Sequence, residues 1–297
     1  MRTSRRRQAA ARARTGAARP ARRPDPGAPR PGTAMRVILL GTGTPIPDVN
    51  RCGPSLVVCL SRDRLLFDCG FGATHQLLRA GVEPRSVTHL FFTHHHYDHI
   101  VDYGYFVLST WRTGRAHPLR VFGPPGTARI TAALFDEVYG VDRHWRRTVV
   151  RPGVLPDITL DVGEVDAGAV AAGADWRVTA VRVEHPPVPI VLAYAVEAGG
   201  RKVVYSADTV YFPPLADFAR GADLLIHEAV SPHAGTTAHR GHTRPEDVGR
   251  LARAAGVKRV VLNHLEPWEN AARAVAGVRR HYRGRAEAGR DLMAIDL

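Results

Sequence analysis

Short apolar runs separated by turn residues dominate the chain from Met35 onwards. Such runs predict strands, and in the first half we expect them at 36–40, 55–60, 64–68 and 87–92. The run at 87–92 is almost continuously apolar, which favours a central strand buried on both faces. Between these strands, 73–80 has a helical pattern that Gly81 would end.

The second half alternates strands with helices. We expect strands at 119–122, 176–183, 190–197, 201–206, 224–227, 260–262 and 292–295. We expect helices at 127–139, 245–255 and 269–282. Gly140 and Gly256 follow two of these helices and favour their ends, and Pro245 favours a helix start. Strands beside helices in both halves indicate an α/β fold with two sheets between helices, an αββα sandwich, as one domain over 35–297.

The first 34 residues differ in composition from the rest. They contain ten arginines and one acidic residue, Asp25, with almost no large apolar side chains, so we expect a disordered tail. It could be a basic arm for nucleic acid or an anionic membrane. An export signal is disfavoured because no apolar region follows the arginines. A translation start assigned too early, with Met35 as the true start, is the interpretation we favour.

Charge and cysteine content narrow the class of protein. The net charge is +13, of which the first 34 residues carry +9, so 35–297 is only mildly basic at +4. The odd count of three cysteines argues against a disulfide framework and for the cytoplasm. No apolar stretch approaches the roughly 18 residues that span a bilayer, so we expect no membrane segment.

The densest chemical signal is HHHYDH at 94–99, directly after an expected strand. In extended backbone, residues two apart point the same way, so His94 and His96 can bind one metal ion together. Asp98 and His99 follow where a helix would begin, and we expect them to face a second position. Imidazole and carboxylate ligands favour zinc, with manganese or iron as alternatives.

Further candidate ligands end later strands. His185, Asp208 and His264 each follow an apolar run, at the strand end where α/β sheets usually place a site. Within the cluster, His95 and Tyr97 are expected to point away from the metal. The sequence therefore predicts that distant segments complete the metal site.

These motifs together resemble the metallo-β-lactamase superfamily of dinuclear zinc hydrolases, and within it the ribonuclease Z and arylsulfatase-like branch. The resemblance covers Met35 to the C-terminus. It rests on LGTGTP at 40–45, LFDCG at 66–70, THHHYDH at 93–99, FGPPG at 122–126, YSADT at 205–209, IHEA at 226–229, HT at 242–243 and LNH at 262–264.

The resemblance assigns roles to individual positions. It implies one zinc ion on His94, His96 and His185, a second on Asp98, His99 and His264, and Asp208 as the bridge. Asp68 resembles an acid that orients a ligand histidine through a hydrogen bond. His242 resembles a general acid that is not a ligand, and Glu228 resembles its acidic partner. We therefore take Asp98, His242 and Glu228 as the candidate catalytic residues.

This site predicts hydrolysis of an anionic ester by a hydroxide that two zinc ions share. Two Zn²⁺ bring four positive charges, and two aspartates with one hydroxide remove three, so the site stays positive. His242 would protonate the leaving group. It could instead be a loop residue before a helix, and His239 competes for its role. His227 is expected to be structural, whereas Arg240 and Arg244 could contact the anion.

The sequence is compatible with several classes of substrate. A small phosphodiester or aryl sulfate is the leading prediction. A short-armed ribonuclease Z, acting on RNA at the tRNA 3′ end, is the main alternative, followed by a lactone or other ester hydrolase. The stretch from Pro186 to Ala207 is too short for a tRNA-gripping arm, although Arg143–Thr148 or Val149–Gly173 could protrude instead. A homodimer is possible by resemblance, and a metal-free scaffold protein is the non-enzymatic alternative.

Overall fold

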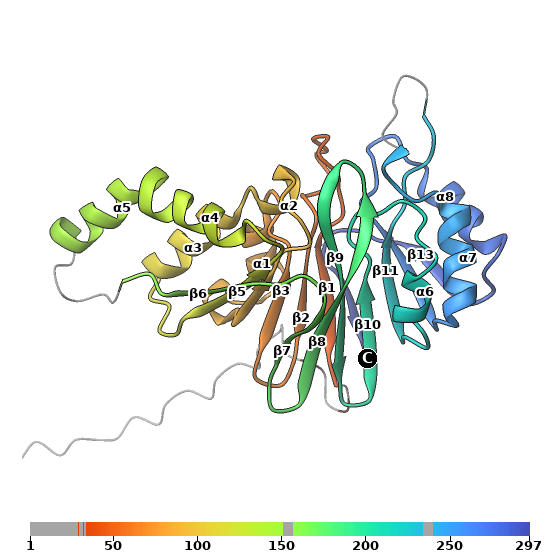
Figure 1. The fold of residues 1–297 in the computed structure, drawn as a ribbon, viewed down its shortest axis with the longest axis horizontal. Coiled ribbons are helices and arrows are strands. Elements are labelled where there is room, and N and C mark those ends of the chain that lie inside the picture. Colours follow the sequence, from red (N-terminus) through yellow and green to blue (C-terminus); the bar gives the residue numbers. More distant parts are fainter. Residues whose placement is uncertain (1–28, 30–31, 33, 151–156, 234–239) are drawn as a thin grey trace, which may run out of the picture.

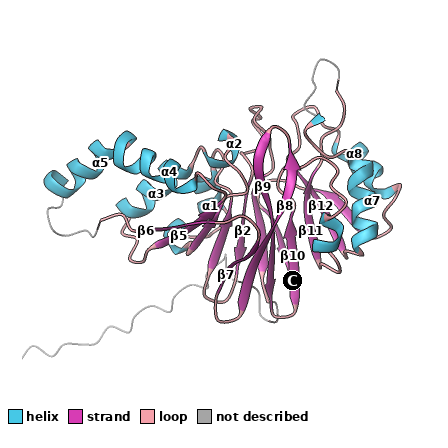
Figure 2. Ribbon diagram, viewed as in Figure 1, coloured by secondary structure: helices cyan, strands magenta, loops and turns pink. Residues whose placement is uncertain are grey.

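Two facing sheets of seven strands form the centre of the molecule, and helices cover both outer faces (Figures 1 and 2). The computed structural model describes residues 29, 32, 34–150, 157–233 and 240–297. This architecture is the αββα sandwich that the sequence predicts. Most of the tail expected to be disordered, 1–34, lies outside the described residues.

The first sheet has the order β14-β1-β2-β3-β4-β5-β6. Its strands are β1 (Arg36–Gly41), β2 (Ser55–Cys59), β3 (Arg64–Phe67), β4 (His89–Phe91), β5 (Leu119–Gly123), β6 (Leu160–Glu164) and β14 (Met293–Asp296). The strands from β3 to β6 run parallel, so their carboxyl ends meet at one edge of the sheet.

The second sheet has the order β13-β12-β11-β10-β9-β8-β7. Its strands are β7 (Gly168–Ala172), β8 (Trp176–His185), β9 (Val188–Ala198), β10 (Arg201–Tyr205), β11 (Leu224–Glu228), β12 (Arg259–Asn263) and β13 (Arg285–Ala288). The strands from β10 to β13 are parallel, while the long pair of β8 and β9 is antiparallel.

Helices lie on the outer sides of the two sheets, and most of them cover an outer face of a sheet (Figure 2). They are α1 (Ala73–Arg79), α2 (Tyr97–Ile100), α3 (Tyr103–Arg112), α4 (Thr127–Ala132), α5 (Gly140–Trp145), α6 (Leu215–Phe218), α7 (Pro245–Ala255) and α8 (Ala271–Arg279). A 3₁₀ turn spans Pro84–Ser86, and π-helical segments span Ala133–Val138 and Arg146–Val150. No helix among the described residues is long and apolar enough to cross a bilayer.

Alternation along each strand divides the core into three layers. In β1, Val37 and Leu39 belong to the cluster between the sheets, whereas Ile38 and Leu40 pack under the helices of the first sheet. This two-sided burial follows from the period of two in a strand. It explains why the strands read as continuous apolar runs rather than as alternating ones.

The prediction that Gly140 ends a helix is wrong. The chain continues through the π-helical segment after α4 and enters α5, which begins at Gly140. Gly256, in contrast, has a φ of 63° and ends α7 as predicted. A glycine ends a helix when it adopts the left-handed conformation, and Gly140 is not among the glycines of positive φ. The strands β6, β7 and β13 and the helix α3 were not predicted.

Candidate metal centre

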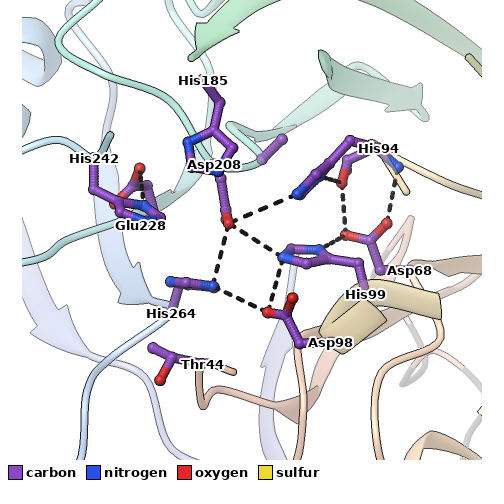
Figure 3. A network of polar contacts seen from close by, with 12 residues as sticks. Thr44, Asp68, His94, Asp98, His99, His185, Asp208, Glu228, His242 and His264 are labelled. Carbon is purple, nitrogen blue, oxygen red and sulfur yellow. Dashed lines mark hydrogen bonds and ion pairs between the residues drawn. The ribbon is translucent and has the colours of Figure 1, made fainter. Parts of the chain in front are cut away.

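The candidate ligands lie where strands of both sheets end. His94 and His96 follow β4, His185 ends β8, and Asp208 and His264 follow β10 and β12. Because the carboxyl ends of the parallel strands share an edge, segments far apart in the sequence converge there. Figure 3 shows His94, His185, Asp208 and His264 pointing toward a common centre.

Among the described residues, three groups of side chains offer ligand atoms that lie within 4.8 Å of one another in each group, and two of them contain the candidate ligands. The first contains His94, His96, His185 and Asp208, and the second contains Asp98, His99 and His264. These are the two sets that the sequence predicts. Asp98 and His99 lie on the single turn of α2, and His96 precedes it in extended conformation. The change from extended backbone to helix therefore divides the ligands of one motif between two positions, as expected.

Asp208 lies between the two groups. Its Oδ2 atom is 3.9 Å from Nε2 of His94, 3.3 Å from Nε2 of His99 and 3.2 Å from Nε2 of His264. Burial disfavours the ionised carboxyl, but His264 and His99 hold the pKa of Asp208 well below its usual value. One carboxylate oxygen thus reaches both groups, as a bridging ligand requires.

Three of the histidines have Nδ1 engaged in a polar contact, which leaves Nε2 for the centre. Nδ1 of His99 lies 2.9 Å from Asp68, and Nδ1 of His185 lies 2.7 Å from the carbonyl oxygen of Gly241. Nδ1 of His94 lies 2.9 Å from the hydroxyl of Thr93. A hydrogen bond at Nδ1 sets the ring orientation and leaves Nε2 for a metal.

Asp68 is the centre of a buried hydrogen-bond network. Its carboxylate accepts hydrogen bonds from the backbone N–H of Thr93, at 2.8 Å, and from the hydroxyls of Thr93 and Tyr205, at 3.0 and 3.1 Å. With the contact to His99, the carboxylate has four polar partners. Asp68 therefore has the position expected of an acid that orients a ligand histidine. Sequence reasoning gave no role to Thr93 or Tyr205, although both lie in the quoted motifs.

Several buried polar atoms at the centre have no hydrogen-bond partner among the described residues. They are Nε2 of His94, His99 and His264, Nδ1 of His264, and both carboxylate oxygens of Asp98. Leaving such atoms unsatisfied is costly. Nitrogen and carboxylate oxygen are ligands that zinc favours. The residues present therefore fit a divalent metal centre.

The neighbouring rings and carboxylates also perturb one another electrostatically. Burial and the nearby His99 hold the pKa of His94 well below its usual value. Burial opposes protonation of His99, but Asp208 and Asp98 raise its pKa well above the usual value. A metal ion that binds here would displace protons from the imidazoles, so its affinity depends on pH.

His242 and Glu228 form a second feature beside the ligands. Nδ1 of His242 lies 2.9 Å from Oε1 of Glu228, which also accepts the N–H of Thr209 at 2.8 Å. The His242 ring is 4.8 Å from the His185 ring and 5.1 Å from the His264 ring. Burial disfavours the imidazolium, but the charge of Glu228 raises the pKa of His242 to about 9. The pair is therefore built to hold a proton next to the candidate ligands.

An open pocket of about 480 Å³ leads to the centre. It is lined by Pro45, His96, His185, Pro186, Asp208, Arg240, Gly241, His242 and His264. The predicted competitor of His242, His239, lies outside the described residues. His227 is fully buried with Nδ1 2.7 Å from the carbonyl oxygen of Glu228, which agrees with a structural role. Arg240 lines the pocket, whereas Arg244 precedes α7.

The two other side chains of the histidine motif point away from the centre, as predicted. Nε2 of His95 lies 2.9 Å from the hydroxyl of Thr127. The hydroxyl of Tyr97 donates to the carbonyl oxygen of Pro45 at 3.1 Å, and the ring is exposed. Only alternate positions of the motif therefore face the metal centre before α2 begins.

Three non-glycine residues at the candidate metal centre have a left-handed backbone conformation. Asp68, Ala207 and His264 have φ values of 55°, 58° and 52°. Non-glycine residues in this left-handed region are uncommon, and they cluster at functional sites. Nothing in the sequence signals these conformations, because aspartate, alanine and histidine are ordinary residues at strand ends.

Known proteins share both the fold and the sequence. Residues 63–265 match the family model described as a beta-lactamase superfamily domain. The ribonuclease Z of Mycobacterium bovis (strain BCG / Pasteur 1173P2) is 30% identical over 284 residues, which cover 89% of this chain and 98% of that protein. The ribonuclease Z of Mycolicibacterium paratuberculosis (strain ATCC BAA-968 / K-10) is 32% identical over 281 residues, with the same coverage.

Solved structures show the same fold. The metallo-beta-lactamase fold protein YhfI from Bacillus subtilis superposes with a TM-score of 0.73 at 21% identity, covering 89% of this chain and 99% of that chain. The short form of human tRNase Z superposes with a TM-score of 0.70 at 22% identity, covering 88% and 98%. At these identities the likeness concerns the fold alone.

The chain belongs to the beta-lactamase superfamily, and it is a metal-dependent hydrolase of that superfamily. Within the superfamily it belongs to the ribonuclease Z-like branch, as its curated relatives of about 30% identity show.

Proposed function

We propose that the protein hydrolyses phosphodiester bonds in RNA with two divalent metal ions, as a ribonuclease Z. One observation carries the proposal: Asp208 joins two complete ligand groups, and a histidine–glutamate pair stands beside them. His94, His96 and His185 would hold one ion, and Asp98, His99 and His264 the other. Zinc is the proposed metal because its preferred ligands are present.

Charge at the site supports an anionic substrate. Two divalent ions contribute four positive charges, and Asp98 and Asp208 remove two, which leaves a positive centre. Arg240 lines the same pocket and adds a further positive charge at its rim. Bound metal ions would polarise the phosphoryl group and activate the attacking water. A phosphodiester therefore suits this pocket better than a neutral ester does.

His242 is the proposed general acid. Glu228 engages Nδ1, so Nε2 is the atom that can donate a proton to the leaving oxygen. One ring nitrogen of His242 also lies within 4.8 Å of ligand atoms of Asp208 and His264, which brings this side chain to the metal centre. The negative charge of Glu228 raises the pKa of His242 against burial, which favours the protonated ring that a general acid requires. General acid catalysis of this kind typically contributes about 10²–10⁴-fold.

The names of the curated relatives favour RNA as the substrate. The length of the chain between His185 and Asp208 supports a second candidate substrate. The relatives that align over nearly their whole length are named ribonuclease Z. Between His185 and Asp208, however, the chain contains only β9, β10 and a tight turn, so no arm projects there. A small phosphodiester or aryl sulfate is therefore the second candidate substrate.

A parallel assay distinguishes the candidates. The full chain loaded with zinc is given a precursor tRNA with a 3′ trailer, bis(p-nitrophenyl) phosphate and p-nitrophenyl sulfate. The proposal predicts cleavage at the trailer and of the phosphodiester, with both activities lost in Asp208→Ala. Cleavage of the small phosphodiester or of the sulfate ester, with no cleavage at the trailer, would show that the second candidate is right.

A further inference from the structure

The loop after β1 carries the motif LGTGTP at 40–45, and Thr42 within it is fully buried. The carbonyl oxygen of Thr42 accepts the backbone N–H of Leu265 at 2.9 Å. Leu265 directly follows the candidate ligand His264, whose φ of 52° is left-handed. A non-glycine residue keeps this conformation only where surrounding contacts hold it. The position of Thr42 therefore helps to fix the backbone that presents His264.

Asp291, in the turn between β13 and β14, holds Thr42 in place. Its Oδ1 atom accepts the backbone N–H of Thr42 at 3.0 Å and the hydroxyl of Thr42 at 2.8 Å. Its Oδ2 atom accepts the backbone N–H of Cys52 at 2.7 Å and Nε2 of Gln76 at 3.0 Å. Gln76 lies on α1 and is itself buried. Four donors from three separate segments thus converge on one carboxylate.

The chemistry of these contacts requires a carboxylate at position 291. Each of the four partners donates a hydrogen, so the group between them must accept every hydrogen bond. An ionised carboxylate has acceptor sites for all four, whereas the amide of an asparagine is half donor. Hydrogen bonds to an ionised acceptor are also roughly twice as strong as neutral ones. Asp291→Asn therefore keeps the size of the side chain but sets its NH₂ group against donors.

The segment that begins at Cys52 supports another ligand of the same group. A Cβ added at Gly53 would lie 3.0 Å from the carbonyl oxygen of Asp98, and a Cβ added at Gly70 would lie 2.4 Å from it. The backbone of Asp98 thus rests directly on these two glycines. Because Asp291 holds the N–H of Cys52, it fixes the segment on which Asp98 rests.

The first ligand group has separate supports. Nδ1 of His94 lies 2.9 Å from the hydroxyl of Thr93, and Nδ1 of His185 lies 2.7 Å from the carbonyl oxygen of Gly241. The contacts of Asp291 lead instead to the second group. A change at Asp291 should therefore act on one metal position and spare the other.

We propose that Asp291 is a positioning residue for the metal position of Asp98, His99 and His264, which it supports from outside the site through Thr42 and Cys52. The inference rests on the metal centre of the function proposed above, but not on its substrate. A partner bonded directly to a ligand typically changes metal affinity 10–100-fold. Asp291 acts through backbone segments, so we expect an effect at the lower end of this range, about tenfold.

The test is the zinc affinity of the full chain, measured by competition with a chromophoric chelator. His185→Asn leaves only the second ligand group complete, and His264→Asn leaves only the first. Asp291→Asn should weaken zinc binding about tenfold when combined with His185→Asn. Combined with His264→Asn, it should leave zinc binding within about twofold, as distant and independent sites do.

A second carboxylate controls for a general loss of stability. Asp223 directly precedes β11, whereas the metal centre lies where the strands end. It accepts the backbone N–H of Lys202 at 2.9 Å and contacts Lys258 and Arg201 at 2.8 and 3.1 Å. Asp223→Asn should lower the urea midpoint, as Asp291→Asn does, but leave the zinc affinity at both positions unchanged.

Two substitutions at Thr42 test the same connection without changing Asp291. Thr42→Val removes the hydroxyl that donates to Asp291 but keeps the shape of the side chain, whereas Thr42→Ser keeps the hydroxyl. Combined with His185→Asn, Thr42→Val should weaken zinc binding at least about threefold, because it removes a hydrogen bond to a charged group. Thr42→Ser should bind zinc as its parent does.

The outcomes separate this inference from the proposed function. Equal weakening of both metal positions, zinc binding unchanged by Asp291→Asn and Thr42→Val, or an equal loss of affinity in Asp223→Asn would each overturn the inference alone. A wild-type chain that binds no zinc would refute the proposed function, and this inference with it.

Discussion

The contact between Glu228 and His242 makes a quantitative prediction about pH dependence. Glu228→Gln keeps the size of the side chain and a carbonyl oxygen for the N–H of Thr209, but it removes the negative charge. That charge is the main influence that raises the pKa of His242, against burial, to about 9. Without it, we expect the pKa of His242 to fall toward or below the ordinary value of about 6.5.

The size of the effect follows from these two values. At pH 7.5, a group of pKa about 9 is about 97% protonated. A group of pKa about 6.5 is only about 9% protonated at the same pH. The fraction of enzyme in which His242 is protonated and can act as a general acid therefore falls about tenfold. Bound divalent ions would lower the pKa of His242 in wild type and variant alike, so the difference between them persists.

The assay is the pH profile of kcat/KM on bis(p-nitrophenyl) phosphate for wild type and variant. A general acid is lost as pH rises through its pKa, so the descending limb should move to lower pH by roughly two units in Glu228→Gln. Glu287→Gln, whose glutamate on β13 pairs with Arg259 at the beginning of β12, is the control. A rate that falls equally at every pH, with the limb unmoved, would refute the general-acid role.

Three further predictions concern the surroundings of the centre. Asp68→Asn removes the charged acceptor at Nδ1 of His99, so metal affinity should fall about 10–100-fold in chelator competition; unchanged affinity would deny Asp68 its orienting role. Gly70→Ala would place a Cβ 2.4 Å from the carbonyl oxygen of Asp98, and urea titration should show a loss of about 1–3 kcal/mol. An undiminished midpoint would mean that α2 shifts without cost. Trp268 is 41% exposed, its Nε1 donates to Glu266, and its ring stacks on His233; its exposed part is expected to stack on bases. Trp268→Ala should raise KM for RNA about fivefold or more while kcat stays near wild type, and an unaltered KM would exclude this contact.

The sequence predicts the candidate ligands because the secondary structure expected around the histidine motif decides which of its side chains face the same way. His94 and His96 alternate on extended backbone, and Asp98 and His99 occupy the turn of α2 that follows. Strand ends then supply the remaining candidates, and parallel pairing brings strand ends together. Each of these inferences rests on local periodicity, which can be read from a single sequence.

Features that depend on distant packing were not predicted. Helical structure resumes at Gly140 in α5, after Phe135 has packed on Tyr103 of α3 and Tyr139 on Phe135, and no local pattern in the sequence shows these contacts. The edge strands β6 and β7 contain no fully buried side chain, so neither has the run of large apolar residues that marks the inner strands. The polar partners of Asp68, Thr93 and Tyr205, are likewise brought together only by the facing sheets.

Metal content in matched variants tests the central claim most directly. The full chain, purified and dialysed against trace zinc, is measured by plasma mass spectrometry beside Asp208→Asn and His95→Gln. The account predicts about two metal ions per chain in wild type and in His95→Gln, whose histidine faces Thr127, and less than one in Asp208→Asn. Metal retained in full by Asp208→Asn, or lost from His95→Gln alone, would contradict the site described for this chain.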